Sequence, residues 1–62
     1  MIITITDIRA AGHCVRGARH WFDQYNLDFR LFIRNGIDSA VMLETGDARG
    51  IDVVRKAEAR RG

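Results

Sequence analysis

The apolar residues between positions 13 and 26 all fall on one side of a helix. At 100° per residue, one arc of about 120° holds every apolar side chain of this segment, and all other residues lie outside it. The arc consists of Cys14, Val15, Ala18, Trp21, Phe22 and Tyr25. The pattern predicts an amphipathic helix that begins near His13. Since the arc holds the only Trp, Tyr and Cys of the chain, we expect these side chains to be used in packing.

Four shorter helices are predicted from residues that cap helix ends. Each is preceded by Asp or Thr, whose side chain can accept the free N–H groups of a first turn, and three are followed by a glycine. They run over residues 8–11 after Thr6 or Asp7, over residues 29–35 after Asp28, over residues 39–45 after Asp38, and from about residue 48 to residue 60 after Asp47. Gly50 weakens the first turn of the last helix.

The first six residues, MIITIT, have a different character. Five of the six are β-branched residues, which favour an extended strand over a helix. Because no second stretch of this kind is present, the strand has three possible arrangements: it hangs loose, lies along its own helices, or pairs with a strand of another molecule. All three remain open at this stage.

The predicted fold is an all-α bundle of four to five short helices with an extended N-terminal arm at residues 1–6, forming one domain over residues 1–62. A chain of this length buries only about 60% of its unfolded surface, so we expect a small core and low stability. The predicted core is Ile8, Val15, Ala18, Phe22, Tyr25, Leu27, Phe29, Phe32, Ile33, Ile37, Val41, Ile51 and Val54. Cys14 is expected to be a buried thiol, and Trp21 to lie at the edge of the apolar arc.

Motifs for catalysis or cofactor binding are missing from the sequence. His13 and His20 share a helix face but stand seven residues apart, which does not fit a metal site. His13 and Cys14 are adjacent, so their side chains point about 100° apart and do not form a nucleophile–base pair. A pocket of useful size would also consume core that so short a chain lacks. We therefore expect no enzyme activity, cofactor, metal or small-molecule substrate.

Charge and hydropathy limit the kinds of partner that we expect this chain to bind. The net charge is +2 and the isoelectric point about 9.3, with acidic and basic residues mostly interleaved. The sequence lacks both a secretory signal and an apolar run of about 18 residues, so we expect no membrane contact. Arg49, Lys56 and Arg60 share one face of the last predicted helix, which makes nucleic-acid binding an alternative. Asp52 lies within reach of Lys56 on that helix, and this favours an ordinary solvated face.

The runs TDIRAAGHCVRGARHWF, LDFRLFIRNGI and LETGDARGIDVV resemble a set of small helical proteins encoded by tailed bacteriophages and prophages. The resemblance extends over nearly the whole chain, and its shared residues are helix boundaries. It implies a viral protein made in the host cytoplasm that acts in virion structure or assembly, in the head or tail, or binds a host factor.

The predicted function is therefore protein–protein interaction, with a protein partner or a second copy of the chain. The alternatives are a small nucleic-acid-binding regulator that uses the basic C-terminal helix, and an inhibitor of a host protein. A marginally stable domain gains most by binding a partner. The predicted protein-binding residues are Ile2, Ile3, Thr4, Ile5, Trp21, Arg49, Lys56 and Arg60.

Overall fold

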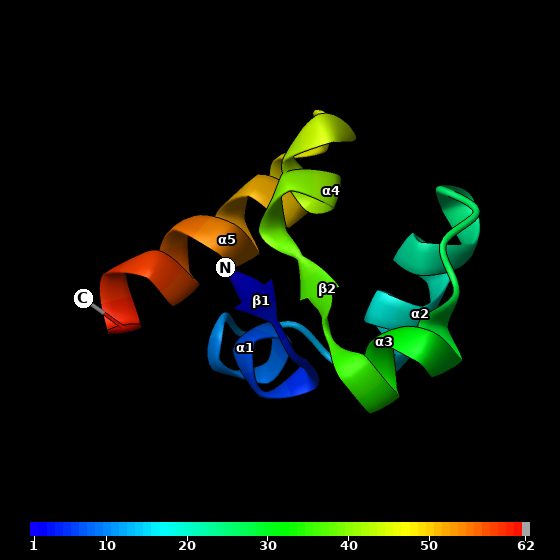
Figure 1. The fold of residues 1–62 in the computed structure, drawn as a ribbon, viewed down its shortest axis with the longest axis horizontal. Coiled ribbons are helices and arrows are strands. Elements are labelled where there is room, and N and C mark those ends of the chain that lie inside the picture. Colours follow the sequence, from blue (N-terminus) through cyan, green and yellow to red (C-terminus); the bar gives the residue numbers. More distant parts are fainter. Residues whose placement is uncertain (62) are drawn as a thin grey trace.

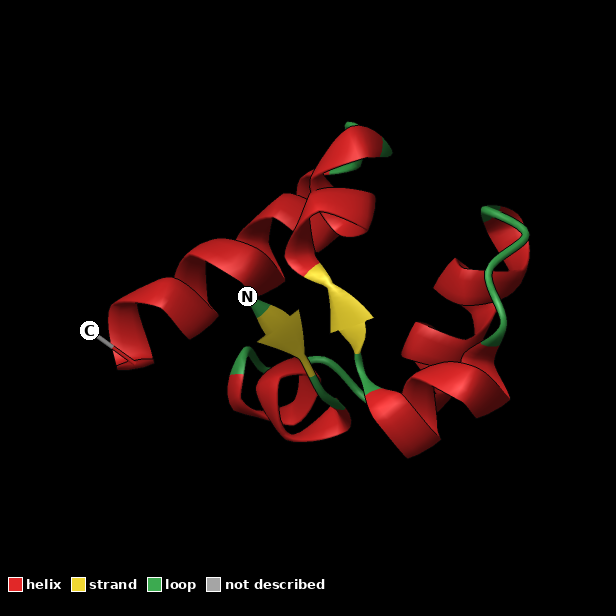
Figure 2. Cartoon of the chain, in the orientation of Figure 1, coloured by secondary structure: helices red, strands yellow, loops and turns green. Residues whose placement is uncertain are grey.

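A computed structural model describes residues 1–61, which form five helices and one two-stranded antiparallel sheet (Figures 1 and 2). The sheet lies between two groups of helices, with α4 and α5 on one side and α2 and α3 on the other (Figure 1). In chain order the elements are β1 (Ile2–Ile3), α1 (Ile5–Ala10), α2 (Val15–Gln24), α3 (Phe29–Asn35), β2 (Ile37–Asp38), α4 (Ser39–Glu44) and α5 (Ala48–Arg61).

The predicted aspartate caps of the last three helices are confirmed. Asp28 accepts a hydrogen bond from the Leu31 N–H at 3.0 Å, and Asp38 accepts one from the Ala40 N–H at 2.9 Å. Asp47 accepts one from the Arg49 N–H at 2.8 Å. These bonds satisfy N–H groups that a helix leaves unpaired in its first turn. Local sequence chemistry is thus sufficient to place the starts of α3, α4 and α5.

The start of α1 differs from the prediction. Thr4, and not Thr6 or Asp7, occupies the cap position, so the helix begins at Ile5. Asp7 lies in the first turn, and its carboxylate accepts a hydrogen bond from the Thr4 N–H at 2.8 Å. An acidic residue three positions into a helix commonly reaches back to the cap in this way. The extended segment consequently ends before residue 5, and the predicted arm over residues 1–6 is too long.

The prediction of a small, mostly helical fold with four to five helices is confirmed, but the fold is not purely all-α, because the N-terminal strand has a partner within the chain. Ile2 pairs with Asp38 and Ile3 with Ile37 in antiparallel register. The sequence suggested only a helix boundary at Ile37–Asp38, since two residues give no detectable strand pattern. Gly36 (φ +76°) permits the approach, because a Cβ there would lie 2.8 Å from the Ile3 carbonyl oxygen. The N-terminal segment is therefore an integral strand of the fold.

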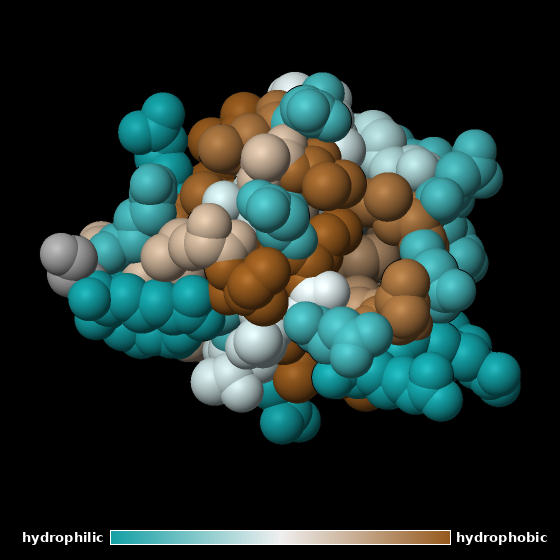
Figure 3. Space-filling view, viewed as in Figure 1, coloured by the Kyte–Doolittle hydropathy of each residue, from teal (hydrophilic) through white to brown (hydrophobic). Residues whose placement is uncertain are grey.

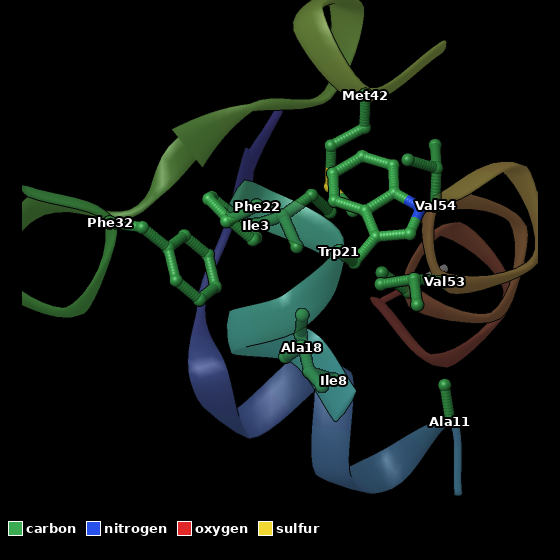
Figure 4. Packing of buried hydrophobic residues seen from close by; sticks show 11 residues of the cluster. Ile3, Ile8, Ala11, Ala18, Trp21, Phe22, Phe32, Met42, Val53 and Val54 are labelled. Carbon is green, nitrogen blue, oxygen red and sulfur yellow. The ribbon is translucent and has the colours of Figure 1, made fainter. Parts of the chain in front are cut away.

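The buried apolar side chains form one cluster to which every helix contributes (Figure 4). Of the predicted core, Ile8, Ala18, Phe22, Phe32 and Val54 are buried, whereas Val15 and Ile33 are exposed. The buried residues that the prediction missed are Ile3, Ala11, Trp21, Met42, Val53 and Ala57.

Trp21 lies inside the core and not at its edge, with 5% of its surface exposed. Gly50 of α5 explains the difference, because a Cβ at this position would lie only 2.8 Å from Cζ2 of the indole. The glycine that weakens α5 as a helix is therefore the place where the indole packs against it. This contact brings α2 and α5 together.

Candidate functional site

The predicted basic face of α5 is occupied by contacts within the chain. The Arg49 guanidinium lies 3.0 Å from the Asp47 carboxylate. Lys56 Nζ lies 3.2 Å from Asp52 Oδ2. Arg60 forms an ion pair with the buried Asp7. Each positive charge that was predicted to meet a partner is thus close to a carboxylate of the same molecule.

Asp7 is the most deeply buried charged group among residues 1–61, and its side chain has no exposed surface. The carboxylate contacts the guanidinium groups of Arg60 and Arg61 and accepts hydrogen bonds from the N–H and hydroxyl of Thr4. Arg61 also donates to the Ile2 carbonyl oxygen at 2.8 Å. These contacts hold the end of α5 against β1 and α1, so Arg60 has a structural role.

A second polar cluster joins α2 to the start of α5. The Tyr25 hydroxyl donates to Asp47 Oδ2 at 2.6 Å, and Arg49 donates to both carboxylate oxygens of Asp47. These bonds, with Arg49 first and Tyr25 second, lower the pKa of Asp47 well below its usual range, against the opposing effect of burial. The Trp21 indole N–H completes no hydrogen bond of normal geometry among residues 1–61 and contributes least to this shift.

The same cluster raises the pKa of Tyr25, chiefly because its hydroxyl donates to a carboxylate that stays ionised. The hydrogen bond from Arg49 to Asp47 likewise raises the pKa of the guanidinium. All three shifts favour the charge states found at neutral pH. The cluster therefore fixes the N-terminus of α5 and offers no group prepared to exchange a proton near pH 7.

Asp52 forms a third cluster with His13 and Lys56. His13 Nε2 lies 3.4 Å from Asp52 Oδ2, and Lys56 also donates to the Ala11 carbonyl oxygen at 3.3 Å. The Lys56 hydrogen bond, assisted by His13, lowers the pKa of Asp52. The cluster links the loop after α1 to α5. Lys56, like Arg60, consequently joins α5 to another part of the chain, here the loop after α1.

A pocket of about 340 Å³ lies between α2 and α5, contrary to the expectation that so short a chain lacks room for one. Its walls are mostly apolar, with Trp21 and Met42 among them, and its polar lining residues are His13, Cys14 and Arg49. Among residues 1–61, His13 and Cys14 share no hydrogen bond. Cys14 Sγ instead accepts one from the Gly17 N–H at 3.3 Å.

Cys14 is exposed and caps α2, so the prediction of a buried thiol is wrong. The helical arc included Cys14, but the helix begins one residue later, and the cap position turns its side chain back toward the first turn. Within the described part of the chain, no group of three or more His, Cys, Asp and Glu side chains is arranged to hold a metal ion. None of the helices there is long and apolar enough to cross a membrane.

Large apolar side chains reach solvent on β1 and α4. Ile2 is 50% exposed, Met1 44% and Leu43 43%. The Met1 carbonyl oxygen accepts a hydrogen bond from the Ser39 N–H at 2.8 Å, and Leu43 lies one helical turn after Ser39. Figure 3 shows hydrophobic side chains gathered over β1, β2 and α4. We name Met1, Ile2 and Leu43 the apolar surface.

The other predicted contact residues of the N-terminal segment are less accessible than Ile2. Ile3 is fully buried, while Thr4 and Ile5 are half-buried at the start of α1. Ile3 is not accessible in this fold, because successive side chains of a strand point to opposite faces and that of Ile3 points into the core. Trp21 is also buried, because its indole packs against Gly50. Of the predicted set, Ile2 alone lies on the apolar surface.

No pattern in the sequence distinguishes Leu43 as an exposed contact residue. Met42 and Leu43 are adjacent apolar residues on a helix of six residues, and only the packing of α4 on α5 determines that Met42 is buried and Leu43 exposed. Met1 is likewise placed by its contact with Ser39, a residue 38 positions away. The apolar surface is thus a product of tertiary structure.

Comparison with known proteins gave no match to a protein family, to a curated protein or to a solved structure.

Proposed function

We propose that this chain is a small protein-binding module that uses the apolar surface of Met1, Ile2 and Leu43. The supporting observation is the exposure of these three large side chains, at 43–50%, on elements that lie side by side. Exposed apolar side chains that gather in one patch commonly mark a site of protein contact. Burying them against a partner removes their apolar area from water.

The surface is held in place before any partner arrives. Ile2 is fixed by its pairing with Asp38, and Met1 by two hydrogen bonds to Ser39 through its carbonyl oxygen and its amino group. Leu43 is fixed on α4, which contacts α5. A surface that is already ordered loses little conformational entropy on binding, and this favours affinity.

The resemblance to tailed-phage proteins leads us to propose a component of a phage particle or of its assembly as the partner. Inhibition of a host protein would use the same surface and differ only in the partner. Binding of nucleic acid by the C-terminal helix receives less support. Arg49, Lys56 and Arg60 each lie beside a carboxylate of the same chain, so phosphate groups would have to compete with these existing ion pairs.

Site-specific photo-crosslinking tests the proposed surface. A photoreactive amino acid is placed at position 43, and the full chain is irradiated in the cells that naturally make it. We expect a discrete adduct with one protein, because a residue at the centre of an interface lies within reach of the partner. A second copy of this chain as the crosslinked protein is distinguished by adduct mass and by sedimentation of the purified chain.

Leu31 provides the matched control. It is a leucine of similar exposure, 52%, but lies on α3. Placing the photoreactive group there should give no comparable adduct, and Ile2→Thr should weaken the adduct formed from position 43 while leaving helical circular dichroism unchanged. Equal adducts from positions 31 and 43, or no adduct from either, would contradict the proposal.

A further inference from the structure

The net positive charge of the chain is concentrated in α2 and α3. Residues 13–36 contain four arginines and two aspartates, whereas the rest of the chain contains six basic and six acidic residues. The whole excess of two positive charges therefore belongs to the segment that was predicted mainly to pack. The C-terminal helix, which looked basic in the sequence, belongs to the balanced part.

The arginines of α2 and α3 also differ in their surroundings. Arg16, Arg19, Arg30 and Arg34 are all exposed, and no carboxylate of residues 1–61 lies within 4.0 Å of them. By contrast, Arg49, Lys56, Arg60 and Arg61 all contact aspartates. Exposed cations without a partner in the chain leave their donors free for an external anion.

The two helices form one unit. Residues 25–28 connect them, with Asn26 in a left-handed conformation (φ +56°) within this turn. The ring of Phe22 on α2 packs against Phe29 and Phe32 on α3, with centroid distances of 5.5 and 4.6 Å. Arg19 lies one turn before Phe22, and Arg30 directly follows Phe29. Arginines therefore lie near this interface on both helices, Arg19 on α2 and Arg30 on α3.

The outer face of α2 is hollowed between its charged residues. Arg16, Arg19, His20 and Asp23 line a surface depression of about 250 Å³. Arg16 is separated from Arg19 and His20 by three and four residues, so the three side chains are neighbours on the helix surface. Asp23 is the acidic member of this face and opposes its positive charge.

We propose that the arginines of α2 and α3 form a surface that binds the phosphate backbone of duplex DNA. Two helices joined by a short turn are a common DNA-binding arrangement, in which the second helix enters the major groove. An α-helix with its side chains is about 10–12 Å across, which suits a major groove about 12 Å wide. Arg30 and Arg34, one turn apart on α3, supply guanidinium groups there, and Arg16 and Arg19 lie on the preceding helix.

This inference uses a different surface from the proposed protein contact and does not depend on it. An acidic protein is the competing partner, because exposed Leu31 and Ile33 accompany the arginines of α3. We favour DNA because the free charges are spread over both helices of a helix–turn–helix unit. A narrow acidic partner segment would need only one of these helices.

Fluorescence anisotropy with a labelled duplex of about 20 base pairs tests the proposal. Four phosphate contacts predict a slope of log affinity against log salt of about −3.6, or a loss of about 150-fold between 50 and 200 mM salt. R16Q/R19Q and R30Q/R34Q should each make this slope shallower by about 1.8. Asp23→Asn should strengthen binding, because it removes the opposing charge.

R9Q/R55Q is the matched control, since Arg9 and Arg55 are exposed, have no carboxylate within 4.0 Å among residues 1–61, and lie on α1 and α5. This variant loses the same net charge and should leave the slope almost unchanged. All variants must keep the circular dichroism of the unmodified chain. An equal effect of the control pair, no binding at 50 mM salt, or tighter binding of a labelled polyglutamate than of the duplex would overturn the proposal.

Discussion

Removing the two arginines that face Asp7 should destabilise the fold more than removing Asp7 itself. In R60Q/R61Q, the carboxylate keeps only its hydrogen bonds from Thr4 and remains completely buried without a counter-charge. Loss of the partner of a buried charge typically costs about 3–5 kcal/mol. In D7N, the amide oxygen still accepts from the Thr4 N–H, and the arginines, with side chains 42% and 39% exposed, can turn toward water. We expect a smaller cost there, of about 1–3 kcal/mol.

Urea unfolding, followed by Trp21 fluorescence and by circular dichroism, measures these differences. Stability of about 0.05–0.15 kcal/mol per residue gives about 3–9 kcal/mol for 62 residues, so the expected loss removes a large part of the stability of R60Q/R61Q. The single variants R60Q and R61Q are therefore measured as well. Each leaves one guanidinium on Asp7 and should cost about 1–2 kcal/mol. Arg55→Gln, on the same helix but without a carboxylate neighbour among residues 1–61, should stay within about 0.5 kcal/mol of the unmodified chain.

The triple variant D7N/R60Q/R61Q decides the interpretation. It removes the unpaired buried charge, so it should be more stable than R60Q/R61Q although it carries one more substitution. Such a gain is the mark of two sites that interact directly. If the triple variant were no more stable than the double variant, Asp7 would not depend on these arginines, and the argument from its burial would be refuted.

Three further predictions concern other parts of the fold. The only tyrosine, Tyr25, should titrate above pH 10 when followed by absorbance at 295 nm. Asp47→Asn should lower the pKa of Tyr25, because the hydrogen bond to an ionised carboxylate would be lost, and an unchanged titration midpoint would contradict this. Gly36→Ala should lower the urea midpoint more than Gly46→Ala, since both glycines have positive φ but only at Gly36 would a Cβ meet β1; equal losses would contradict this. Cys14 should react with a small alkylating reagent in the folded protein as fast as in urea, and strong protection would show that the thiol is covered.

The acid side of the stability curve follows from the lowered pKa values of Asp47 and Asp52. Each carboxylate is held in its ionised form by bonds that the unfolded chain lacks. The stability that they contribute is therefore complete above the ordinary aspartate pKa of about 4, and it is lost as the pH falls through the lower folded-state values. Asp47→Asn and the unmodified chain should accordingly become more alike in stability below pH 4.

Features of this fold that depend on local contacts can be predicted from the sequence. The caps at Asp28, Asp38 and Asp47 each bond to a backbone N–H two or three residues away, so their function can be seen in a short stretch of sequence. The pairing of the N-terminal strand could not be predicted, because it depends on a contact between residues far apart in the sequence. The partner of the N-terminal strand lies 34 to 36 positions further along the chain, and two residues of strand give no periodic signal.

The candidate surfaces likewise depend on distant contacts that the sequence does not reveal. The basic face of α5 has a clear helical spacing, but its cations are bound by Asp7, Asp47 and Asp52, and the pairing of Arg60 with Asp7 joins residues 53 positions apart. Spacing along one helix reveals which charges are neighbours on it, but not which of them meet a charge from another element. The apolar surface was predicted only at Ile2 for the same reason.

The distribution of paired and free charges separates the two binding surfaces that we propose for this chain of 62 residues. The carboxylates of Asp7, Asp47 and Asp52 tie α5 to α1, α2 and the loop after α1, and Arg61 also ties α5 to β1 through the Ile2 carbonyl oxygen. Because these clusters use four of the five basic residues of α5, four of the six cations without a carboxylate neighbour among residues 1–61 are on α2 and α3. The large exposed side chains of β1 and α4 lie over the sheet (Figure 3). A substitution that broke the Asp7 cluster would therefore release cations on α5 and weaken the fold at once. Loss of protein contact in such a variant would reflect unfolding, whereas loss in Ile2→Thr, which leaves these clusters intact, would reflect the apolar surface itself.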